Sequence, residues 1–229
     1  MAPARSFDQM AEHFDRFAEL VGGPLDAWLA SLVPEGGGER AVDLGCGTGR
    51  HAALLAAHYR QVLAVDISVP MLKLASARRG LPNVDYQQRD LREVRADRDG
   101  VFDLVVSAYA LHHLDDLDQA LWHIRELTAP GGRVVLIDNV APTPAVPRRW
   151  FITEAVRNVL LDLFQHRRPP AEAWERFRLN TDPAWLDHLT TDRFLNPTQF
   201  TQRYSAVFPG GRFTDLYRSR AMCWDAPTH

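Results

Sequence analysis

Residues 42–49 read Val-Asp-Leu-Gly-Cys-Gly-Thr-Gly, and the prediction of the whole fold starts from them. The apolar residues up to Leu44 predict a short buried strand, and a helical pattern follows to about His58. Glycine tolerates positive φ angles and lets a ligand approach the backbone closely. A strand that runs through a glycine turn into a helix is typical of a ligand-binding turn in an α/β protein, although a purely structural turn can look similar.

Strands and helices alternate after this turn. The apolar patterns predict further strands at 61–66, 84–88, 101–107 and 133–137, and helices at 69–79 and 115–128. Such alternation favours right-handed β-α-β units and a parallel sheet with helices on both faces. Two strand-like runs at 212–217 and 220–224 are joined by a short connection, so we expect an antiparallel pair at the sheet edge.

The pattern changes on both sides of this core. Apolar spacings of three and four predict helices at 4–20 and 24–33, and the stretch 140–195 has helical stripes but no clear strand. We therefore expect four regions along the chain. They are a helical cap at 1–37, a cofactor-binding core at 38–139, a helical insertion and substrate lid at 140–195, and a last helix with the edge hairpin at 196–229.

Composition excludes several classes of protein. The 229 residues suit one large domain, and no apolar run is long enough to cross a bilayer. Lys and Arg number 26 against 29 Asp and Glu, and a net charge of −3 disfavours a general nucleic-acid binder. Two cysteines make no disulfide framework, and the start of the chain lacks the pattern of a signal peptide. We expect a cytoplasmic protein that is a monomer or a homodimer.

Polar residues at the ends of the predicted strands indicate a nucleoside ligand. Asp66 ends the second strand, 21 residues after Gly45, where a carboxylate can accept hydrogen bonds from ribose hydroxyls. The spacing Gly-x-Gly-x-Gly differs from the dinucleotide pattern, and Asp43 beside it would repel a pyrophosphate but suit a cationic ammonium group. Asp90 follows the third strand, where it can accept from an adenine amino group, and Ser107 ends the fourth.

Together these segments resemble the class I S-adenosylmethionine-dependent methyltransferases, close to the small-molecule group of ubiquinone and menaquinone biosynthesis. The matching segments are Val-Asp-Leu-Gly-Cys-Gly-Thr-Gly (42–49), Ala-Val-Asp-Ile-Ser (64–68), Gln-Arg-Asp-Leu (88–91), Phe-Asp-Leu-Val-Val-Ser-Ala-Tyr-Ala-Leu-His-His-Leu (102–114) and Leu-Thr-Ala-Pro-Gly-Gly-Arg-Val-Val-Leu-Ile-Asp (127–138). The resemblance implies a doubly wound, mostly parallel, seven-stranded Rossmann-like sheet with a reversed hairpin. It also implies S-adenosylmethionine as cofactor and a small-molecule acceptor.

The same resemblance implies which residues bind the cofactor. They are Phe14, Asp43, Gly45, Cys46, Gly47, Asp66, Ile67, Met71, Asp90, Leu91, Ser107 and Ala108. The glycine loop should contact the methionine part of the cofactor, with Asp43 supporting its ammonium group. Asp66 should bind the ribose, Ile67 should lie on the adenine face, and Asp90 should meet the adenine edge. Phe14 would cover the cofactor from the N-terminal helix, although its spacing also fits an ordinary core stripe.

Methyl transfer from a sulfonium requires mainly proximity and exclusion of water. A general base is needed only if the nucleophile arrives protonated. His112, His113 and Tyr109 follow the fourth strand and are the candidates for a base or a substrate contact. The alternative is that the two histidines only orient the backbone of this loop.

A metal is not expected. Asp138 and Asn139 resemble the Asp-Asn pair of the metal-dependent catechol O-methyltransferases, but Ser107 stands where those enzymes have a further carboxylate. A hard cation requires several oxygen ligands, so we expect Asp138 to cap a loop or line the pocket instead.

The acceptor pocket is expected between 140–195 and the N-terminal helix. Asn139, Arg149 and Trp150 are the candidate substrate contacts, although Arg149 can equally be a solvated charge at a helix end. Three other functions stay open: a non-methylating or non-catalytic cofactor-binding protein, an NAD-dependent oxidoreductase, and a nucleic-acid methyltransferase. The last lacks its usual Asn/Asp-Pro-Pro-aromatic motif, since residues 107–110 read Ser-Ala-Tyr-Ala.

Overall fold

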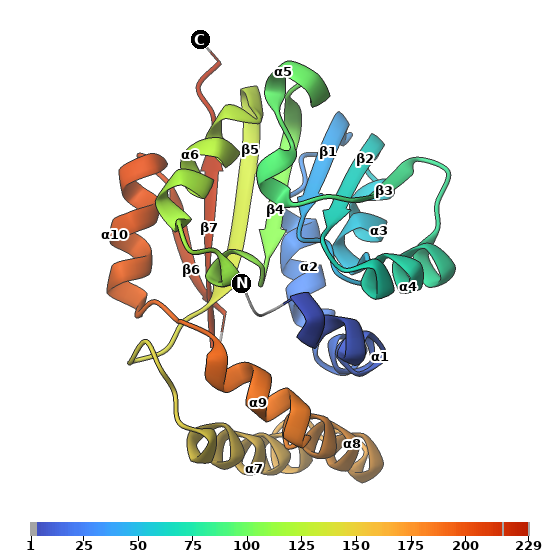
Figure 1. Cartoon of the computed structure of the whole chain (residues 1–229), viewed down its shortest axis with the longest axis vertical. Helices are drawn as coiled ribbons and strands as arrows, with labels where there is room; N and C mark the ends of the chain where they lie inside the picture. Colours follow the sequence, from blue (N-terminus) through green and yellow to red (C-terminus); the bar gives the residue numbers. More distant parts are fainter. Residues whose placement is uncertain (1–3, 217, 229) are drawn as a thin grey trace.

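The centre of the molecule is a seven-stranded sheet of order β3-β2-β1-β4-β5-β7-β6, seen in a computed structural model that describes residues 4–216 and 218–228 (Figure 1). The strands are β1 (Gly38–Leu44), β2 (Tyr59–Asp66), β3 (Val84–Gln88), β4 (Phe102–Ala108), β5 (Thr128–Asn139), β6 (Arg212–Leu216) and β7 (Ser219–Asp225). The first five are parallel, whereas β7 runs antiparallel to β5 and β6. The predicted doubly wound sheet with a reversed edge hairpin is confirmed.

Helices cover both faces of this sheet. They are α1 (Ala4–Val21), α2 (Gly23–Leu32), α3 (Arg50–Ala56), α4 (Val69–Arg79), α5 (Ala96–Asp99), α6 (Leu117–Glu126), α7 (Arg148–Phe164), α8 (Pro170–Asn180), α9 (Pro183–Thr191) and α10 (Pro197–Val207), with 3₁₀ turns η1 (Leu91–Glu93) and η2 (Leu111–His113). Successive side chains of a strand point to opposite faces. In β4, Val105 therefore packs with α6 and α10, whereas Leu104 and Val106 pack with α2 and α3.

The start of β5 differs from the prediction. The sequence predicts a turn at 130–132 and a strand only from Arg133, but β5 already pairs with β4 at Thr128. Thr128 lies opposite Phe102 and Arg133 lies opposite Leu104, so the residues between them form an irregularity in the strand. Gly131 has a φ of 75°, which glycine adopts without a Cβ clash. At the other end of the chain, Tyr217 of the predicted strand 212–217 lies outside the described residues.

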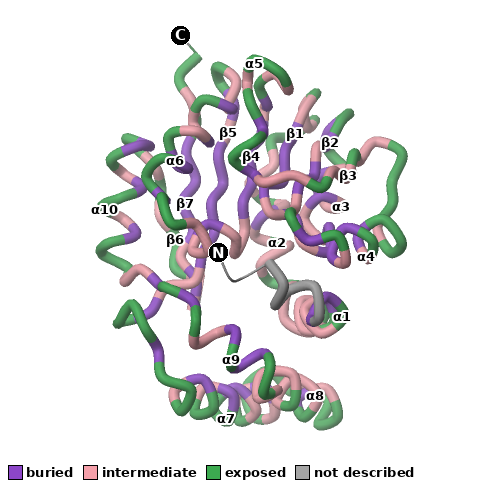
Figure 2. Tube along the Cα trace, viewed as in Figure 1, coloured by how far each residue is buried: buried purple, intermediate pink, exposed green. Residues whose placement is uncertain are grey.

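The stretch 140–195 contains α7, α8 and α9, which lie together beyond the carboxyl ends of β4 and β5 (Figure 1). Val140 and Leu195 form a parallel bridge, so this stretch leaves and rejoins the core at one point. Figure 2 shows that the outer surfaces of α7 and α8 are largely exposed. Its action as a lid stays a prediction. Within the described ranges, no helix has both the length and the apolar character required to span a bilayer.

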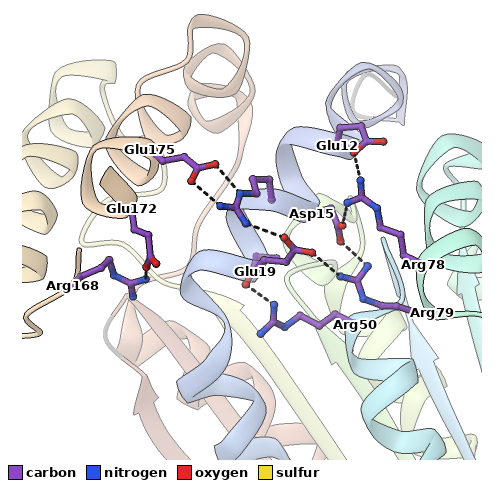
Figure 3. Close-up of polar contacts among 11 residues, drawn as sticks. Glu12, Asp15, Glu19, Arg50, Arg78, Arg79, Arg168, Glu172 and Glu175 are labelled. Carbon is purple, nitrogen blue, oxygen red and sulfur yellow. Dashed lines mark hydrogen bonds and ion pairs between the residues drawn. The ribbon is translucent and has the colours of Figure 1, made fainter. Parts of the chain in front are cut away.

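Ion pairs attach helix α1 to α4 of the core and to α8 of the stretch 140–195 (Figure 3). Asp15 is fully buried and forms ion pairs with Arg78 and Arg79, which are both at the end of α4. A guanidinium nitrogen of Arg79 lies 2.7 Å from Asp15 Oδ1. On the other side, Arg16 pairs with Glu175 of α8 at 2.7 Å. Burial would raise the pKa of Asp15, but hydrogen bonds from Thr48 and the two arginines outweigh it and hold that pKa below its usual value.

Replacing the buried carboxylate should loosen α1. We expect Asp15→Asn to lower the free energy of unfolding by about 1–3 kcal/mol at pH 7, because charge-assisted hydrogen bonds to two arginines are lost. Since the pKa of Asp15 is depressed in the folded protein, the difference from wild type should shrink as the pH falls below about 4. Urea unfolding and hydrogen exchange of the α1 amides measure it. Glu12→Gln removes an exposed partner of Arg78 and should cost less than about 1 kcal/mol; equal losses for both variants would contradict the assignment.

Candidate functional site

The glycine loop after β1 is held against the end of β2 by backbone hydrogen bonds. The amides of Gly45 and Cys46 both donate to the carbonyl of Val65 at 2.9 Å. The amide of Gly47 donates to Oδ2 of Asp66 at 2.8 Å. The loop and the carboxylate predicted to bind ribose are therefore one connected unit at the carboxyl edge of the sheet.

Two glycines of the loop share a positive φ angle but differ in what a side chain would meet at each position. Gly45 and Gly47 have φ angles of 76° and 52°, which side chains rarely adopt. A Cβ at Gly45 would lie 2.4 Å from the Cβ of Ala110, so this position is closed by packing. A Cβ at Gly47 would meet only Phe14 Cε1, at 3.7 Å. The loop backbone at Gly47 therefore faces Phe14 of α1 across a narrow gap.

Asp43 is the most unusual carboxylate beside this loop. It is 1% exposed, and both of its oxygens lack a well-formed hydrogen bond among the described residues. Burial raises the pKa of Asp43 to about 7; the Ala52 amide opposes this rise and the Asp66 carboxylate adds to it. An ionised carboxylate is costly in such a position unless a cation or a donor joins it. Burial likewise raises the pKa of the neighbouring Cys46 thiol well above its usual value.

At the end of β2, Asp66 has one oxygen bound to the loop, and the other accepts the amide of Ser68 at 2.8 Å. The next residue, Ile67, is an apolar side chain that is 48% exposed. Met71 differs from it, because its side chain is 2% exposed on the inner face of α4. The structure thus brings Ile67 and the Asp66 carboxylate to the loop and leaves Met71 in the core.

At the end of β3, Asp90 begins the turn η1. Its carboxylate accepts the Arg92 amide at 2.9 Å and pairs with the guanidinium of the same residue at 2.5 Å. The Arg92 hydrogen bond, which outweighs burial, lowers the pKa of Asp90. Leu91 is buried in the core cluster with α6. The predicted adenine contact of Asp90 therefore has an arginine as competitor.

At the end of β4, Ser107 is fully buried and donates its hydroxyl to the Leu44 carbonyl at 2.8 Å. Ala108, the last residue of the strand, is half-buried. Tyr109 follows with a φ of 59°, a strained conformation for a side-chain-bearing residue. Its hydroxyl accepts a hydrogen bond from Ser219 Oγ at 3.1 Å, and burial raises the pKa of Tyr109.

His112 lies between two buried carboxylates. Its Nδ1 is 2.5 Å from Asp138 Oδ1, and its Nε2 is 3.6 Å from Asp192 Oδ2. The same Asp138 also accepts the backbone amides of His112 and Asn139, at 2.9 and 2.8 Å. Burial would lower the pKa of His112, but the Asp138 and Asp192 carboxylates outweigh it and raise the pKa to about 10. Asp138 thus orients the turn η2 and the His112 ring together.

His113 has the opposite electrostatic environment. Its Nδ1 lies 3.5 Å from Asp192 Oδ1, and burial, followed by the charge of His112, lowers the pKa of His113 to about 3. His188 of α9 approaches the same carboxylate, with Nε2 at 3.9 Å from Oδ2. Asp192 and His188 could not be predicted from the sequence, because they lie far along the chain from η2 and belong to no local motif.

Another part of the site that the sequence did not predict is the aromatic contact between α1 and α9. Trp185 is buried, with its ring 5.5 Å from His13, 6.3 Å from Phe14 and 6.0 Å from Phe17. On its other side Trp185 is 5.6 Å from His188. Phe14, which faces the glycine loop, is therefore linked through Trp185 to the histidines after β4.

The three predicted substrate contacts lie in different places. Asn139, at the end of β5, accepts the Ser219 hydroxyl at 3.3 Å. Arg149 is exposed at the start of α7. Trp150 is covered by the Arg218 guanidinium, 4.3 Å from the centre of its ring. Only Asn139 is thereby brought next to the Asp138 and His112 pair.

The residues around the loop fit the cofactor that the resemblance implies. Asp43 offers an unpaired buried carboxylate, Gly47 offers bare backbone facing Phe14, and Ile67 offers an exposed apolar side chain. Two hollows of about 550 and 280 Å³ lie elsewhere, beside α4 and β3 and over α6, and neither is lined by the glycine loop. At the loop itself, the backbone of Gly47 is approached by Phe14 of α1.

Comparison with known proteins gives a family match over the core. Residues 42–136 match the family described as a methyltransferase domain. An uncharacterized methyltransferase of Mycobacterium tuberculosis is 37% identical over 118 residues, which are 52% of this chain and 59% of that protein. A demethylmenaquinone methyltransferase of Clavibacter sepedonicus is 29% identical over 201 residues, covering 85% of this chain and 80% of that one. The chain thus spans less than two thirds of the length of the mycobacterial relative.

A solved structure is similar over nearly the whole chain. The structure of a DhpI–SAH complex has a TM-score of 0.66 and 24% identity, and the match covers 98% of this chain and 96% of that chain. At this level of identity, the match supports the fold, including α7–α9 and the edge hairpin.

Neutralising the buried carboxylate of the loop should stabilise the ligand-free protein. The pKa of this carboxyl rises from about 4 to about 7 on folding, so the free energy of unfolding falls as the pH rises from 4 to 7. We therefore expect Asp43→Asn to raise the free energy of unfolding by about 2–4 kcal/mol at pH 8, with the gain shrinking toward pH 5. Urea unfolding at several pH values measures this. Asp85→Asn, an exposed site on β3, should stay within about 0.5 kcal/mol of wild type; an Asp43→Asn gain that does not depend on pH would contradict the argument.

Proposed function

We propose that the chain is a class I S-adenosylmethionine-dependent methyltransferase, which transfers a methyl group from this cofactor to a small-molecule acceptor. The methylated atom is an oxygen, nitrogen or carbon nucleophile. The demethylmenaquinone methyltransferase similarity and the net charge of −3 both favour a small metabolite over a nucleic acid.

The observation that carries the proposal is the buried Asp43 carboxylate beside the glycine loop, which has no ion pair among the described residues. S-adenosylmethionine carries an ammonium and a sulfonium, so a buried carboxylate next to it gains an opposite charge. A dinucleotide would bring a pyrophosphate to the same turn, and Asp43 would repel it. This difference favours the methyltransferase over the NAD-dependent alternative.

In this proposal Gly45 and Gly47 bind the methionine part and Asp43 the region of its ammonium. Asp66 binds the ribose and Ile67 lies on the adenine. The cofactor, when bound, supplies an electrophilic methyl group. Phe14 and Trp185, which pack together across the carboxyl edge, exclude water from the reacting atoms.

The surroundings of the predicted base candidates move their pKa values away from neutral pH. The pKa of His112 is raised to about 10, whereas that of His113 is lowered to about 3. Burial raises the pKa of Tyr109 as well. An efficient general base titrates near the working pH. We therefore infer that the reaction proceeds by proximity and desolvation, on an acceptor that is already nucleophilic.

The acceptor is placed between α1 and α9 in this proposal. Phe17, His13 and Trp185 meet there and offer ring faces to a planar or apolar metabolite. The oligomeric state, a monomer or homodimer, and a cytoplasmic location remain predictions.

Calorimetric titration with S-adenosylmethionine, S-adenosylhomocysteine and NAD in parallel tests the cofactor. We expect binding of the first two in the micromolar range and none of NAD. Binding of NAD alone would overturn the proposal. With the cofactor established, incubation of metabolite mixtures with a methyl-labelled cofactor, read by mass spectrometry, identifies the acceptor.

Replacement of the strand-end carboxylate should weaken cofactor binding. We expect Asp66→Ala to cost about 2–3 kcal/mol, a loss of roughly 30- to 150-fold in affinity, because charge-assisted hydrogen bonds to the ribose are removed. Asp66 also holds the Gly47 amide, so unfolding of the ligand-free variant should be measured beside the titration. Asp85→Ala is the matched control on the neighbouring strand. An unchanged dissociation constant for Asp66→Ala would contradict the ribose assignment.

A further inference from the structure

Three histidines and two carboxylates from distant parts of the chain meet at the carboxyl edge of β4 and β5. His112 and His113 lie in η2, and Asp138 lies at the end of β5. His188 belongs to α9, and Asp192 is the residue directly after this helix. Four of these side chains are no more than 7% exposed, and His113 is 16% exposed. Such a cluster is buried far more deeply than ordinary surface charges.

The distances within the cluster suit shared coordination of one ion. The nitrogens of His112, His113 and His188 lie 3.6, 3.5 and 3.9 Å from the Asp192 carboxylate. Hydrogen bonds between such groups are about 2.7–3.2 Å long. Ligand atoms about 2.0–2.1 Å from a tetrahedral metal ion are roughly 3.3–3.4 Å from each other. One ligand atom from each of His112, His113 and Asp192 can be chosen so that all lie within 4.8 Å of one another.

The His112 ring is already oriented as a metal ligand requires. Its Nδ1 contacts Asp138 Oδ1 at 2.5 Å, which leaves Nε2 directed to Asp192. A ligating histidine commonly donates its second ring nitrogen to a carboxylate, which fixes the tautomer and the ring. Asp138 is itself fixed by the backbone amides of His112 and Asn139. The outer partner of the site is therefore present as well as the ligands.

The charge of the cluster also favours a cation. Asp138 and Asp192 are both buried, and the ion pairs described for them are to histidines. A divalent ion would replace the histidine proton that otherwise balances one of these carboxylates, and it would balance both. Imidazole nitrogens with one carboxylate oxygen are a ligand set that zinc and related first-row metals accept.

We propose that His112, His113 and Asp192 bind a divalent transition-metal ion of the zinc class. This site differs from a catechol-type arrangement at Asp138 and Asn139, because Asp138 here contacts a ligand instead of the metal. The ion joins the turn after β4 to the end of α9, so it fixes the stretch 140–195 against the core. The proposal does not depend on the cofactor or on methyl transfer.

Metal titration of the untagged wild-type protein is the first test, since a histidine tag would bind the same ions. After removal of bound metal by a chelator and dialysis, zinc binding is measured by competition with a chromophoric chelator. Cobalt binding is followed by its visible absorption. We expect one equivalent per chain, a dissociation constant below micromolar, cobalt bands of a tetrahedral site, and a melting temperature that rises with zinc. No saturable binding of either ion, or only weak binding with many equivalents, would overturn the proposal.

Variants then locate the site. Asp192→Asn and His113→Gln preserve size but remove a ligand, and each should weaken zinc binding by about 100-fold or more. Asp138→Asn removes only the outer partner and should weaken it about 10- to 100-fold. His166→Gln, an exposed histidine just beyond α7, is the matched control and should bind zinc like wild type. Wild-type affinity in Asp192→Asn would overturn the assignment. If that variant does not fold, the wild-type cobalt spectrum decides.

Cofactor titrations on the same samples keep the two proposals separate. Zinc binding without S-adenosylmethionine binding would refute only the proposed function. S-adenosylmethionine binding without a metal would refute only the metal site.

Discussion

Parallel pairing of β1 with β2 and β4, and of β4 with β5, brings four strand ends to the same edge of the sheet. The candidate site depends on this constraint, because the residues at the carboxyl ends of parallel strands all lie at one edge of the sheet. Asp66, Ser107 and Asp138 lie within the last two residues of their strands, and the glycine loop follows directly after β1. Helices α1 and α9 then cover an edge whose chemistry the sheet has already arranged.

Buried carboxylates at this edge are balanced in three different ways. Asp15 has two arginines, and its pKa is lowered below the usual value despite burial. Asp43 has no such partner, and burial raises its pKa to about 7. Asp192 lies 3.6 Å from the ring of His112 and 3.5 Å from that of His113. The first arrangement holds a helix, the second suits a cationic ligand, and the third is the place of the proposed metal ion.

Sequence patterns predicted the sheet and the glycine loop because both depend on local order along the chain. Apolar runs between glycine turns define β1 to β4, and the reversed hairpin follows from the short connection before β7. The predicted start of β5 at Arg133 was wrong, because Gly131 can form an irregularity inside a strand as readily as a turn between two elements. Spacing alone could not separate Met71, which is buried, from Ile67, which is exposed.

Contacts between distant segments could not be predicted in the same way. Asp192 and His188 meet His113 only because the chain between Val140 and Leu195 leaves the core and returns to it. Trp185 likewise meets Phe14 only when α9 packs on α1. No periodicity or motif records such a meeting, so this half of the candidate site required the three-dimensional structure.

The position of Phe14 has a consequence for the order of events in turnover. Its ring faces Gly47 across a gap in which an added carbon would already be in van der Waals contact, and α1 is tied to α4 and to α8. A cofactor placed on the glycine loop as proposed would have to enter before α1 covers it, and the acceptor would then meet a surface that the cofactor has completed. The proposed reaction is accordingly an ordered sequential one, in which the cofactor binds first and its demethylated product leaves last.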